Sequence, residues 1–196
     1  MKLVLASSNA GKLRELAALL QPLGHELIAQ SSLGIESPPE TGVTFEANAL
    51  IKARHAAQRA GLPALADDSG IEVDALGGRP GVRSARYAGE QASDAANLQK
   101  MLTELKGVPL AERTARYRCV IALVLDSNDQ QPLLAAGAWD GLIIETPRGQ
   151  GGFGYDPVFL PAGMALTAAE LATDEKNRLS HRAQALRRLV ELLCRS

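Results

Sequence analysis

The sequence has few of the residues that build disulfide-rich or zinc-stabilised proteins. Only two of its 196 residues are cysteines, and Cys119 and Cys194 lie far apart. A disulfide framework or a zinc site needs several cysteines at short spacings. The sequence therefore argues against both classes and favours a protein that works in a reducing compartment.

Long hydrophobic runs are also missing. The apolar run near the first residue covers only residues 3–6, which is too short for the apolar region of a signal peptide. No other segment approaches the roughly 20 apolar residues of a membrane span. We therefore expect a cytoplasmic protein without a membrane partner.

Neither sign of charge dominates the composition. The chain has 21 basic and 22 acidic side chains, which gives a net charge of −1. Proteins that bind nucleic-acid backbones normally carry a basic excess or a basic stripe. We expect no nucleic-acid partner, although a few local cations could still hold a small anionic ligand.

The elements that are present indicate an α/β fold. With 46% hydrophobic residues, the chain has an ordinary globular composition, and we expect a single domain over residues 1–196. Short apolar strands are expected at residues 3–6 and 25–30. The first is followed by a helix that carries Leu13, Leu16, Leu19 and Leu20, and the second by a long helix that Thr44 caps and that runs to about Arg59. Two longer strands flank the turn-rich residues 127–131 and predict a hairpin. Interleaved helices together with a hairpin indicate a mixed sheet.

Residues 7–12, with the sequence SSNAGK, form a turn between a strand and a helix. The N–H groups of a helix N-terminus favour anions, Lys12 adds a positive charge, and Ser7, Ser8 and Asn9 can donate hydrogen bonds. The alternative is a helix N-cap followed by a glycine turn, which this segment alone favours. It is not a P-loop, because Leu13 stands where Ser or Thr should bind Mg²⁺.

The segment PALADDSGIEVDALGG, residues 63–78, joins an apolar run to two adjacent carboxylates. Asp67 and Asp68 at the carboxyl end of a strand could hold Mg²⁺ together with substrate phosphate oxygens. The alternative is an Asx-type turn, in which Asp68 and Ser69 bond to local backbone and Gly70 relieves strain. The two interpretations have similar weight on this segment alone.

The helix that Thr44 is expected to cap carries a polar face. Asn48 and Lys52 lie four residues apart and share that face, while Glu40 lies in the preceding loop and could turn towards another acidic site. The alternative is an amphipathic helix whose polar side chains meet water.

Residues 151–157, GGFGYDP, combine glycines with two aromatic residues in a chain that is only 4% aromatic. Phe153 and Tyr155 could stack on a planar ligand, which is worth roughly 1–3 kcal/mol for a base, although glycine-rich hairpin loops are common. Further along, His181 and Arg182 follow Ser180 in the first turn of a helix, where cations oppose the helix dipole. A broken local rule of this kind is a hint of function, and two solvated side chains are the alternative.

Six segments in this order resemble the inosine triphosphate pyrophosphatase family, the non-canonical purine nucleoside triphosphate pyrophosphatases. They are SSNAGK, ETGVTFEANALIKARHAA, ADDSG, LGGRPGVRSARYAGE, GGFGYDPVF and SHRAQAL, and they span essentially the whole chain. Each motif is weak alone, but six in order make a specific match.

The resemblance implies Mg²⁺-dependent hydrolysis of ITP, dITP, XTP and dXTP to the monophosphate and pyrophosphate. The enzyme would cleanse the nucleotide pool of deaminated purines. The resemblance also implies a homodimer and an elongated mixed sheet flanked by helices, with two lobes and a substrate cleft between them.

Site roles follow residue by residue from the same resemblance. Asp68 is the catalytic carboxylate, acting as a general base or a Mg²⁺ ligand, and Glu40 and Asp67 are further metal contacts. The implied substrate-binding residues are Ser7, Ser8, Asn9, Ala10, Gly11, Lys12 and Lys52 for the triphosphate, Ser69 beside the substrate, and Phe153, Gly154, Tyr155, Asp156, Lys176, His181 and Arg182 for the nucleoside.

Two of these residues suggest how the base is selected. Hypoxanthine and xanthine carry an oxygen at C6, to which His181 and Arg182 can donate hydrogen bonds, whereas adenine presents its own donors there. Buried donors left unpaired discriminate strongly against the wrong base. The competing hypotheses are a non-catalytic nucleotide- or RNA-binding module and a pyrophosphatase for modified pyrimidine or canonical nucleotides.

Overall fold

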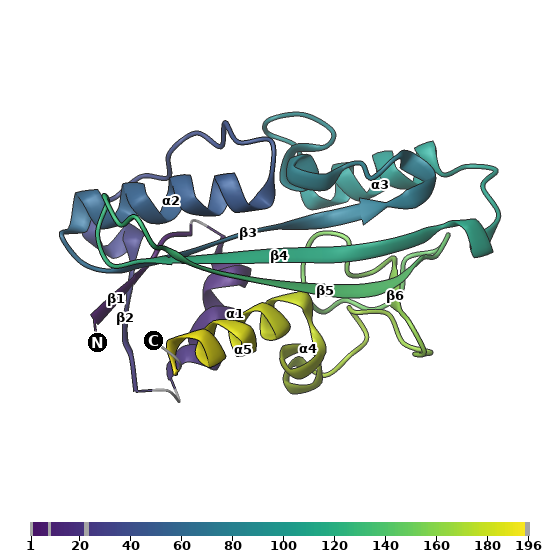
Figure 1. Cartoon of the computed structure of the whole chain (residues 1–196). Coiled ribbons are helices and arrows are strands. Elements are labelled where there is room, and N and C mark those ends of the chain that lie inside the picture. Colours follow the sequence, from purple (N-terminus) through teal and green to yellow (C-terminus); the bar gives the residue numbers. More distant parts are fainter. Residues whose placement is uncertain (1, 8, 22–23, 195–196) are drawn as a thin grey trace. The chain divides into compact units, whose positions relative to one another are not determined.

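The computed structural model describes residues 2–7, 9–21 and 24–194, and its centre is a six-stranded sheet (Figure 1). The strands follow the order β2-β1-β3-β4-β5-β6. Their bounds are Lys2–Leu5 for β1, Glu26–Ala29 for β2, Ala64–Val73 for β3, Thr114–Val124 for β4, Leu133–Ile143 for β5 and Phe159–Pro161 for β6. Strand β1 pairs in parallel with β2 and β3, whereas β5 and β6 are antiparallel, so the predicted mixed α/β sheet is confirmed.

The helices flank this sheet. They are α1 (Ala10–Leu20), α2 (Phe45–Ala60), α3 (Asp94–Glu104), α4 (Thr173–Leu179) and α5 (His181–Leu193). By its contacts the chain divides into two compact units. Unit 1 holds residues up to 68, 119–137 and from 182 onwards, and unit 2 holds residues 69–118 and 138–181. The division falls within strands β3, β4 and β5.

In unit 1, helices cover both faces of the strands, and the core lies between the helices and the strands. Helices α1 and α5 lie on one side of the strands and α2 lies on the other (Figure 1). The side of α1 and α5 is packed with Leu3, Leu5, Leu16, Leu20, Leu65, Cys119, Ile121, Leu123, Ala135, Ala185, Leu186 and Leu189. Helix α2 instead buries four alanines, Ala49, Ala53, Ala56 and Ala57. Near-continuous apolar strands are what two covered faces require.

Side-chain caps begin two of the helices, and the cap at Thr44 is the one that the sequence predicts. The Thr44 hydroxyl accepts the Ala47 N–H at 3.2 Å at the start of α2, and Ser93 does the same for Ala96 at the start of α3. Each cap satisfies a backbone donor that has no partner within its helix. Helix α2 ends at Gly61, whose φ of 64° is the left-handed conformation that glycine adopts at no steric cost.

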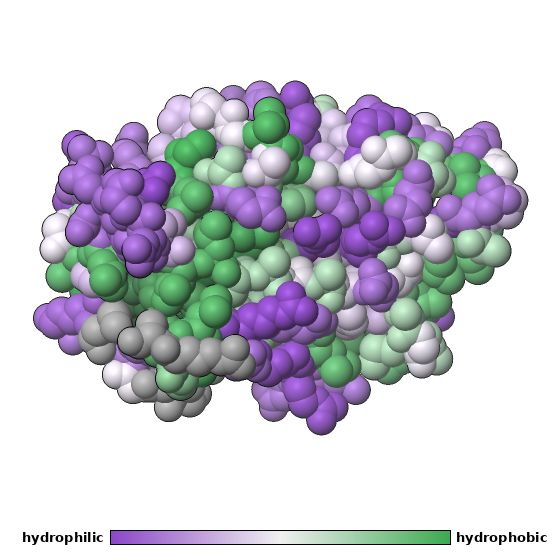
Figure 2. All heavy atoms as spheres, in the orientation of Figure 1, coloured by the Kyte–Doolittle hydropathy of each residue, from purple (hydrophilic) through white to green (hydrophobic). Residues whose placement is uncertain are grey.

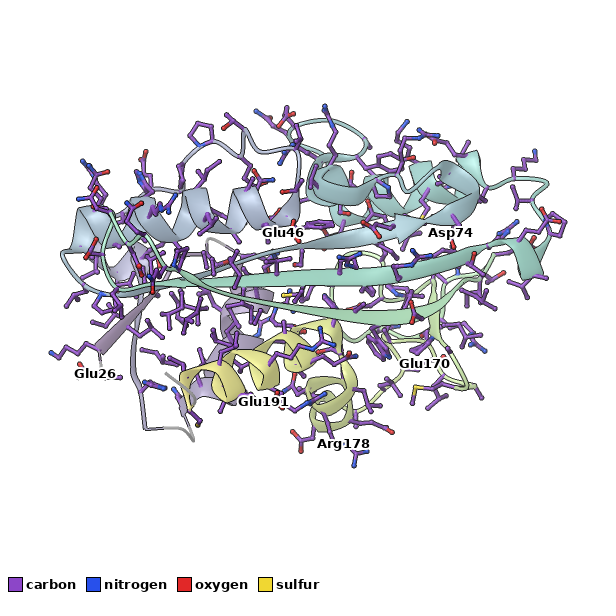
Figure 3. All side chains as sticks on the ribbon, viewed as in Figure 1. Glu26, Glu46, Asp74, Glu170, Arg178 and Glu191 are labelled. Atoms are coloured by element: carbon purple, nitrogen blue, oxygen red, sulfur yellow. The ribbon has the colours of Figure 1, made fainter. Side chains whose placement is uncertain are left out.

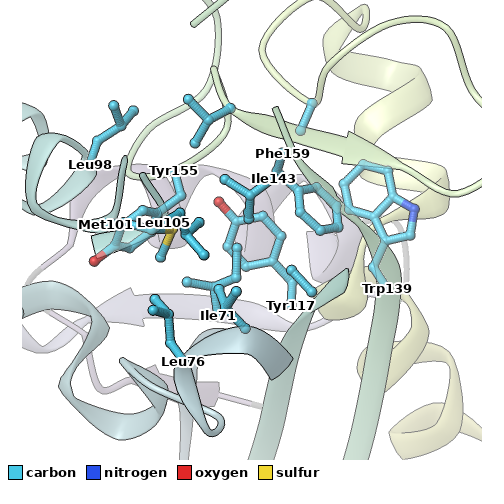
Figure 4. Close-up of a cluster of buried hydrophobic side chains, with 14 of the residues drawn as sticks. Ile71, Leu76, Leu98, Met101, Leu105, Tyr117, Trp139, Ile143, Tyr155 and Phe159 are labelled. Carbon is cyan, nitrogen blue, oxygen red and sulfur yellow. The ribbon is translucent and has the colours of Figure 1, made fainter. Parts of the chain in front are cut away.

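The core of unit 2 is built around aromatic rings. Figure 4 shows Tyr117 from β4 close to Phe159, with Trp139 beyond it. The Tyr117 and Phe159 ring centroids are 4.7 Å apart in an edge-to-face contact, and those of Trp139 and Phe159 are 5.5 Å apart. Helix α3 adds the side chains of Leu98 and Met101 to this cluster, and Leu105, which follows the helix, adds another.

The predicted hairpin is confirmed. Strands β4 and β5 are neighbours in the sheet and are joined by residues 125–132. A parallel connection would need a crossover of about a dozen residues or more, so these strands run antiparallel.

One expectation about the acidic segment is wrong. Strand β3 does not end at Asp67 and Asp68 but continues to Val73, and no Asx-type turn forms at Ser69 and Gly70. The strand that ends here is β1, whose last residue, Leu5, is in register with Leu65. The carboxylates therefore lie just beyond the carboxyl end of β1 and inside β3.

Within the described ranges, no helix combines the length and the apolar character that crossing a bilayer requires.

The close approach of β5 and β6 yields a stability prediction. A Cβ added to Gly141 would lie 2.4 Å from the carbonyl oxygen of Leu160. Because a backbone atom cannot move aside cheaply, we expect Gly141→Ala to lower the free energy of unfolding by about 1–3 kcal/mol. The matched control is Asp140→Ala on the adjacent exposed position. Urea unfolding that gives equal stabilities for the two variants would contradict the packing described here.

Candidate active site

Several predicted site residues are charged yet buried, which is unusual for ionised side chains. Most charged side chains lie on the outside, as Glu26, Arg178 and Glu191 do in Figure 3. By contrast, seven of the predicted residues have at most 7% of their surface exposed: Lys52, Asp67, Asp68, Asp156, Lys176, His181 and Arg182. Burial of charge persists only where partners compensate it, so the partners of these residues define the site.

The turn after β1 is held in place by backbone and side-chain hydrogen bonds. The Ala6 N–H donates to the Leu65 carbonyl at 2.8 Å, and the Ser7 hydroxyl accepts the Asn9 N–H at 3.2 Å. The Asn9 side chain then accepts the N–H groups of Gly11 and Lys12 at 2.9 and 3.1 Å. The N-cap interpretation is thus confirmed, and a phosphate at this turn would compete with the Asn9 cap. Ser8 lies outside the described residues, and Ala10 contributes the first backbone position of α1.

Asp67 and Asp68 point to opposite faces of the sheet, because adjacent residues of a strand alternate. Asp67 lies on the side of α1 and α5, 3.2 Å from the Lys12 ammonium, and Asp68 lies on the side of α2, 2.8 Å from the Lys52 ammonium. The two carboxylates therefore have different partners and can have different roles.

The Asp68 side holds two carboxylates and one cation. The Lys52 ammonium donates to Asp68 Oδ1 at 2.8 Å and to Glu40 Oε1 at 2.9 Å. Asn48, one turn before Lys52 on α2, donates to Asp68 Oδ2 at 3.3 Å and accepts the Gly42 N–H at 2.8 Å. The predicted shared face of Asn48 and Lys52 is confirmed, and the Glu40 loop does turn towards an acidic residue. We define Glu40, Asn48, Lys52 and Asp68 as the Asp68 cluster.

Burial changes the acidity of this cluster. Burial disfavours the charged form of Asp68 and raises its pKa against the opposing attraction of Lys52. Burial alone would lower the pKa of Lys52, but the carboxylates of Asp68, Asp67 and Glu40 outweigh it, and the pKa of Lys52 is raised. Lys52 therefore stays charged at neutral pH.

The Asp67 side is balanced by two cations. Besides Lys12, the Arg182 guanidinium donates to Asp67 Oδ2 at 3.3 Å and also pairs with Glu15. Burial would raise the pKa of Asp67, but Lys12 and Arg182 lie so close that the pKa is held well below its usual range. Arg182 is only 1% exposed, and its base-contacting role stays a prediction.

The remaining predicted residues gather in unit 2 around Asp156. The Lys176 ammonium donates to Asp156 Oδ2 at 2.7 Å and lies 4.9 Å from the centroid of the Phe153 ring. The Phe153 N–H donates to the same oxygen at 2.8 Å, and the Tyr117 hydroxyl donates to Oδ1 at 3.1 Å. His181 stacks on Tyr117. We call these five residues the aromatic cluster.

Two predicted residues of the glycine-rich loop form hydrogen bonds that hold the loop to other segments of unit 2. The Tyr155 ring is buried in the core of unit 2, and its hydroxyl donates to the Ser84 carbonyl at 2.8 Å. The Gly154 N–H donates to Asp94 at 2.8 Å. Of the two aromatic residues in the loop, Phe153 is therefore the one whose ring is partly accessible for stacking. Ser69 follows Asp68 within β3 and is half-buried.

Sequence reasoning did not identify Glu15 or Tyr117. Glu15 lies three residues after Lys12 on α1, a spacing that places both on one face and could have suggested a shared partner. Tyr117 carries no such signal, because alternation along β4 predicts only that its side chain is buried.

The Asp68 cluster fits a magnesium ion. Glu40 and Asp68 approach the same ammonium and are therefore near each other, and Mg²⁺ commonly takes one or two carboxylates together with water and phosphate oxygens. Asp67 fits less well, since its carboxylate already contacts Lys12 and Arg182. Among the described residues there is no group of three or more metal-binding side chains, so a metal here would depend on oxygens from the substrate.

The mixed sheet, with Lys12 in the first turn of α1 and Lys52 beside Asp68, defines an α/β protein in which two lysines and a helix N-terminus could attract anions. More specifically, the chain belongs to the Ham1 family, whose model matches residues 3–192. A dITP/XTP pyrophosphatase from Methylococcus capsulatus is 60% identical, over 94% of this chain and 92% of that protein. The dITP/XTP pyrophosphatase of Escherichia coli K12 is 52% identical over 98% of both chains.

Solved structures agree with this assignment. A HAM1 protein from Coxiella burnetii superposes with a TM-score of 0.91 at 48% identity, and the match covers 100% of both chains. The predicted membership of the family of non-canonical purine nucleoside triphosphate pyrophosphatases is thus confirmed.

The burial of Asp67 predicts how stability depends on pH. Because folding lowers the pKa of Asp67, its stabilisation is complete above the pKa of the unfolded carboxyl, about 4, and is lost as the pH falls towards the lower folded value. At pH 7 we expect Asp67→Asn to cost about 3–5 kcal/mol, because it leaves buried cations uncompensated. The cost should shrink below about pH 4.

The control is Glu26→Gln, which removes an exposed ion pair with Lys2. Surface pairs of this kind contribute about 0–1 kcal/mol. Urea unfolding between pH 3 and 7 checks both variants, and a cost for Asp67→Asn that is independent of pH would contradict the assigned role.

Proposed function

We propose that this chain is a hydrolase that converts ITP, dITP, XTP and dXTP to the monophosphate and pyrophosphate, and thereby removes deaminated purine nucleotides. High identity over nearly the full length to proteins named dITP/XTP pyrophosphatase supports this activity. The observation that carries the site assignment is the cluster in which Asp68 and Glu40 share the Lys52 ammonium.

The cofactor is proposed to be Mg²⁺, held by Asp68 and Glu40 together with substrate phosphate oxygens. When bound, the ion would neutralise phosphate charge and make a bound water more acidic. The charge balance supports this position. The cluster contains two carboxylates and one ammonium, so it carries a net charge of −1, whereas Asp67 and Glu15 are matched by Lys12 and Arg182.

Hydrolysis between the α and β phosphates requires an oriented water and a neutralised leaving group. Phosphoryl transfer is catalysed mainly by positioning and electrostatics. Asp68 is proposed either to hold the metal or to orient the attacking water and accept its proton. The two roles oppose each other, because a cation bound to Asp68 stabilises its ionised form. Lys12, Lys52 and the turn at residues 7–12 are proposed to bind the triphosphate.

We propose that residues 1–196 work as a single catalytic domain. Within unit 2, the aromatic cluster is proposed to bind the nucleoside. The Phe153 ring supplies a flat apolar face, and the Lys176 ammonium beside it supplies a positive charge. His181 is proposed to donate to the C6 oxygen of the base, with Arg182 assisting.

We also propose a cytoplasmic homodimer without nucleic-acid or membrane partners. Figure 2 shows a group of hydrophobic residues on the face in view. Two leucines of unit 1 are exposed: Leu125, in the connection between β4 and β5, at 62%, and Leu134, in β5, at 38%. Exposed apolar patches often mark protein interfaces. Analytical ultracentrifugation should return twice the mass of the chain.

The activity is tested with a panel of nucleoside triphosphates, with and without Mg²⁺, in an assay that separates pyrophosphate from orthophosphate. We expect pyrophosphate from ITP, dITP and XTP far faster than from ATP or CTP, and none after chelation. A binding module would leave ITP intact, and a pyrophosphatase for pyrimidine or canonical nucleotides would prefer the other substrates.

The catalytic assignment predicts that Asp68→Asn retains the fold but lowers kcat for ITP by about 100-fold or more, because general-base catalysis contributes about 10²–10⁴-fold. The matched control is Asp74→Asn, which changes an exposed carboxylate paired with Arg116 just after β3. Its kcat should stay within about twofold of wild type. A folded Asp68→Asn variant with near wild-type turnover would refute the role.

A further inference from the structure

Tyr117 is a buried tyrosine whose hydroxyl is directed to a charged group. It lies on β4, is 8% exposed, and packs edge-to-face on Phe159 at a centroid distance of 4.7 Å. Its hydroxyl donates to Asp156 Oδ1 at 3.1 Å. A phenylalanine could provide the same apolar packing, so the hydroxyl serves the contact with Asp156.

The same ring supports His181. The two ring centroids are 4.7 Å apart, and the planes differ by only 8°. Aromatic rings at this distance prefer an offset stack, which restricts rotation of the imidazole about its side-chain bonds. The plane of Tyr117 therefore determines the plane in which His181 can donate a hydrogen bond.

The Tyr117 hydroxyl contacts Asp156, which lies in the other part of the aromatic cluster. Asp156 Oδ2 receives the Phe153 N–H and the Lys176 ammonium, while Tyr117 binds Oδ1. Hydrogen bonds therefore hold both oxygens of the Asp156 carboxylate in place. A Cβ at Gly152 would lie only 2.0 Å from Asp156 Oδ2, so the loop is wrapped closely around this carboxylate. Rotation of Asp156 would displace both Phe153 and Lys176.

We propose that Tyr117 is a positioning residue for base selection, because its ring orients His181 and its hydroxyl orients Asp156, and through Asp156 the Phe153–Lys176 pair. The ligand class is a purine base with an oxygen at C6. This inference rests on the proposed function, since it names how the nucleoside-binding residues of that activity are held. Tyr117 itself does not contact the reacting atoms.

The first test separates the hydroxyl from the ring. Tyr117→Phe keeps the stack but removes the hydrogen bond, and we expect KM for ITP to rise about 2- to 10-fold, the range of one lost hydrogen bond. The kcat should change less than about twofold, since the residues at the phosphate are untouched. The control is Tyr87→Phe, in which a hydroxyl that donates to Glu104 at 2.7 Å is removed. Its KM should equal that of wild type.

The second test concerns the ring. We expect Tyr117→Leu to reduce the ratio of kcat/KM for ITP over ATP by about tenfold or more, because a misoriented donor no longer discriminates between the bases. In wild-type protein, NMR should show nuclear Overhauser contacts between the Tyr117 and His181 ring protons. This measurement decides the role of the ring even if the leucine variant does not fold.

The outcomes are distinct. An unchanged KM in Tyr117→Phe overturns the role of the hydroxyl, and absent ring contacts or an unchanged base preference in folded Tyr117→Leu overturns the role of the ring. Failure of the proposed function would instead appear in the wild-type protein, as a lack of pyrophosphate from ITP.

Discussion

Strand β3 carries two adjacent carboxylates, and the pleat of a strand sends adjacent side chains to opposite faces. Asp67 therefore meets Lys12 and Arg182 on one side of the sheet, and Asp68 meets Lys52 on the other. A turn at this point, or a shift of one residue, would exchange these partners. The different partners of Asp67 and Asp68 thus depend on β3 remaining extended beyond the end of β1.

The balance of charge on each face follows from this alternation. Where Asp67 lies, acidic and basic groups are matched in number, so the carboxylate contributes to the fold and has little capacity for another cation. Where Asp68 lies, Glu40 adds a second carboxylate to one ammonium. Excess negative charge at a buried position is costly unless a cation arrives. The Asp68 cluster is therefore suited to hold a further cation.

The features predictable from the sequence were those set by local chemistry. The cap at Thr44 and the shared face of Asn48 and Lys52 follow from spacing within one helix. The sequence left open how far β3 continues beyond Asp68, because that depends on partners far away in the chain. For the same reason the anchoring of Tyr155 by a distant carbonyl could not be read from a glycine-rich loop. The site residues themselves came from the order of six motifs rather than from any single one.

The most direct test of this account is a crystal structure with Mg²⁺ and a non-hydrolysable ITP analogue. It should place the metal about 2.0–2.1 Å from a carboxylate oxygen of Asp68 or Glu40. Asp67 should keep its contacts with Lys12 and Arg182. A metal bound by Asp67, or one that contacts neither Asp68 nor Glu40, would contradict the assignment of the two faces of β3.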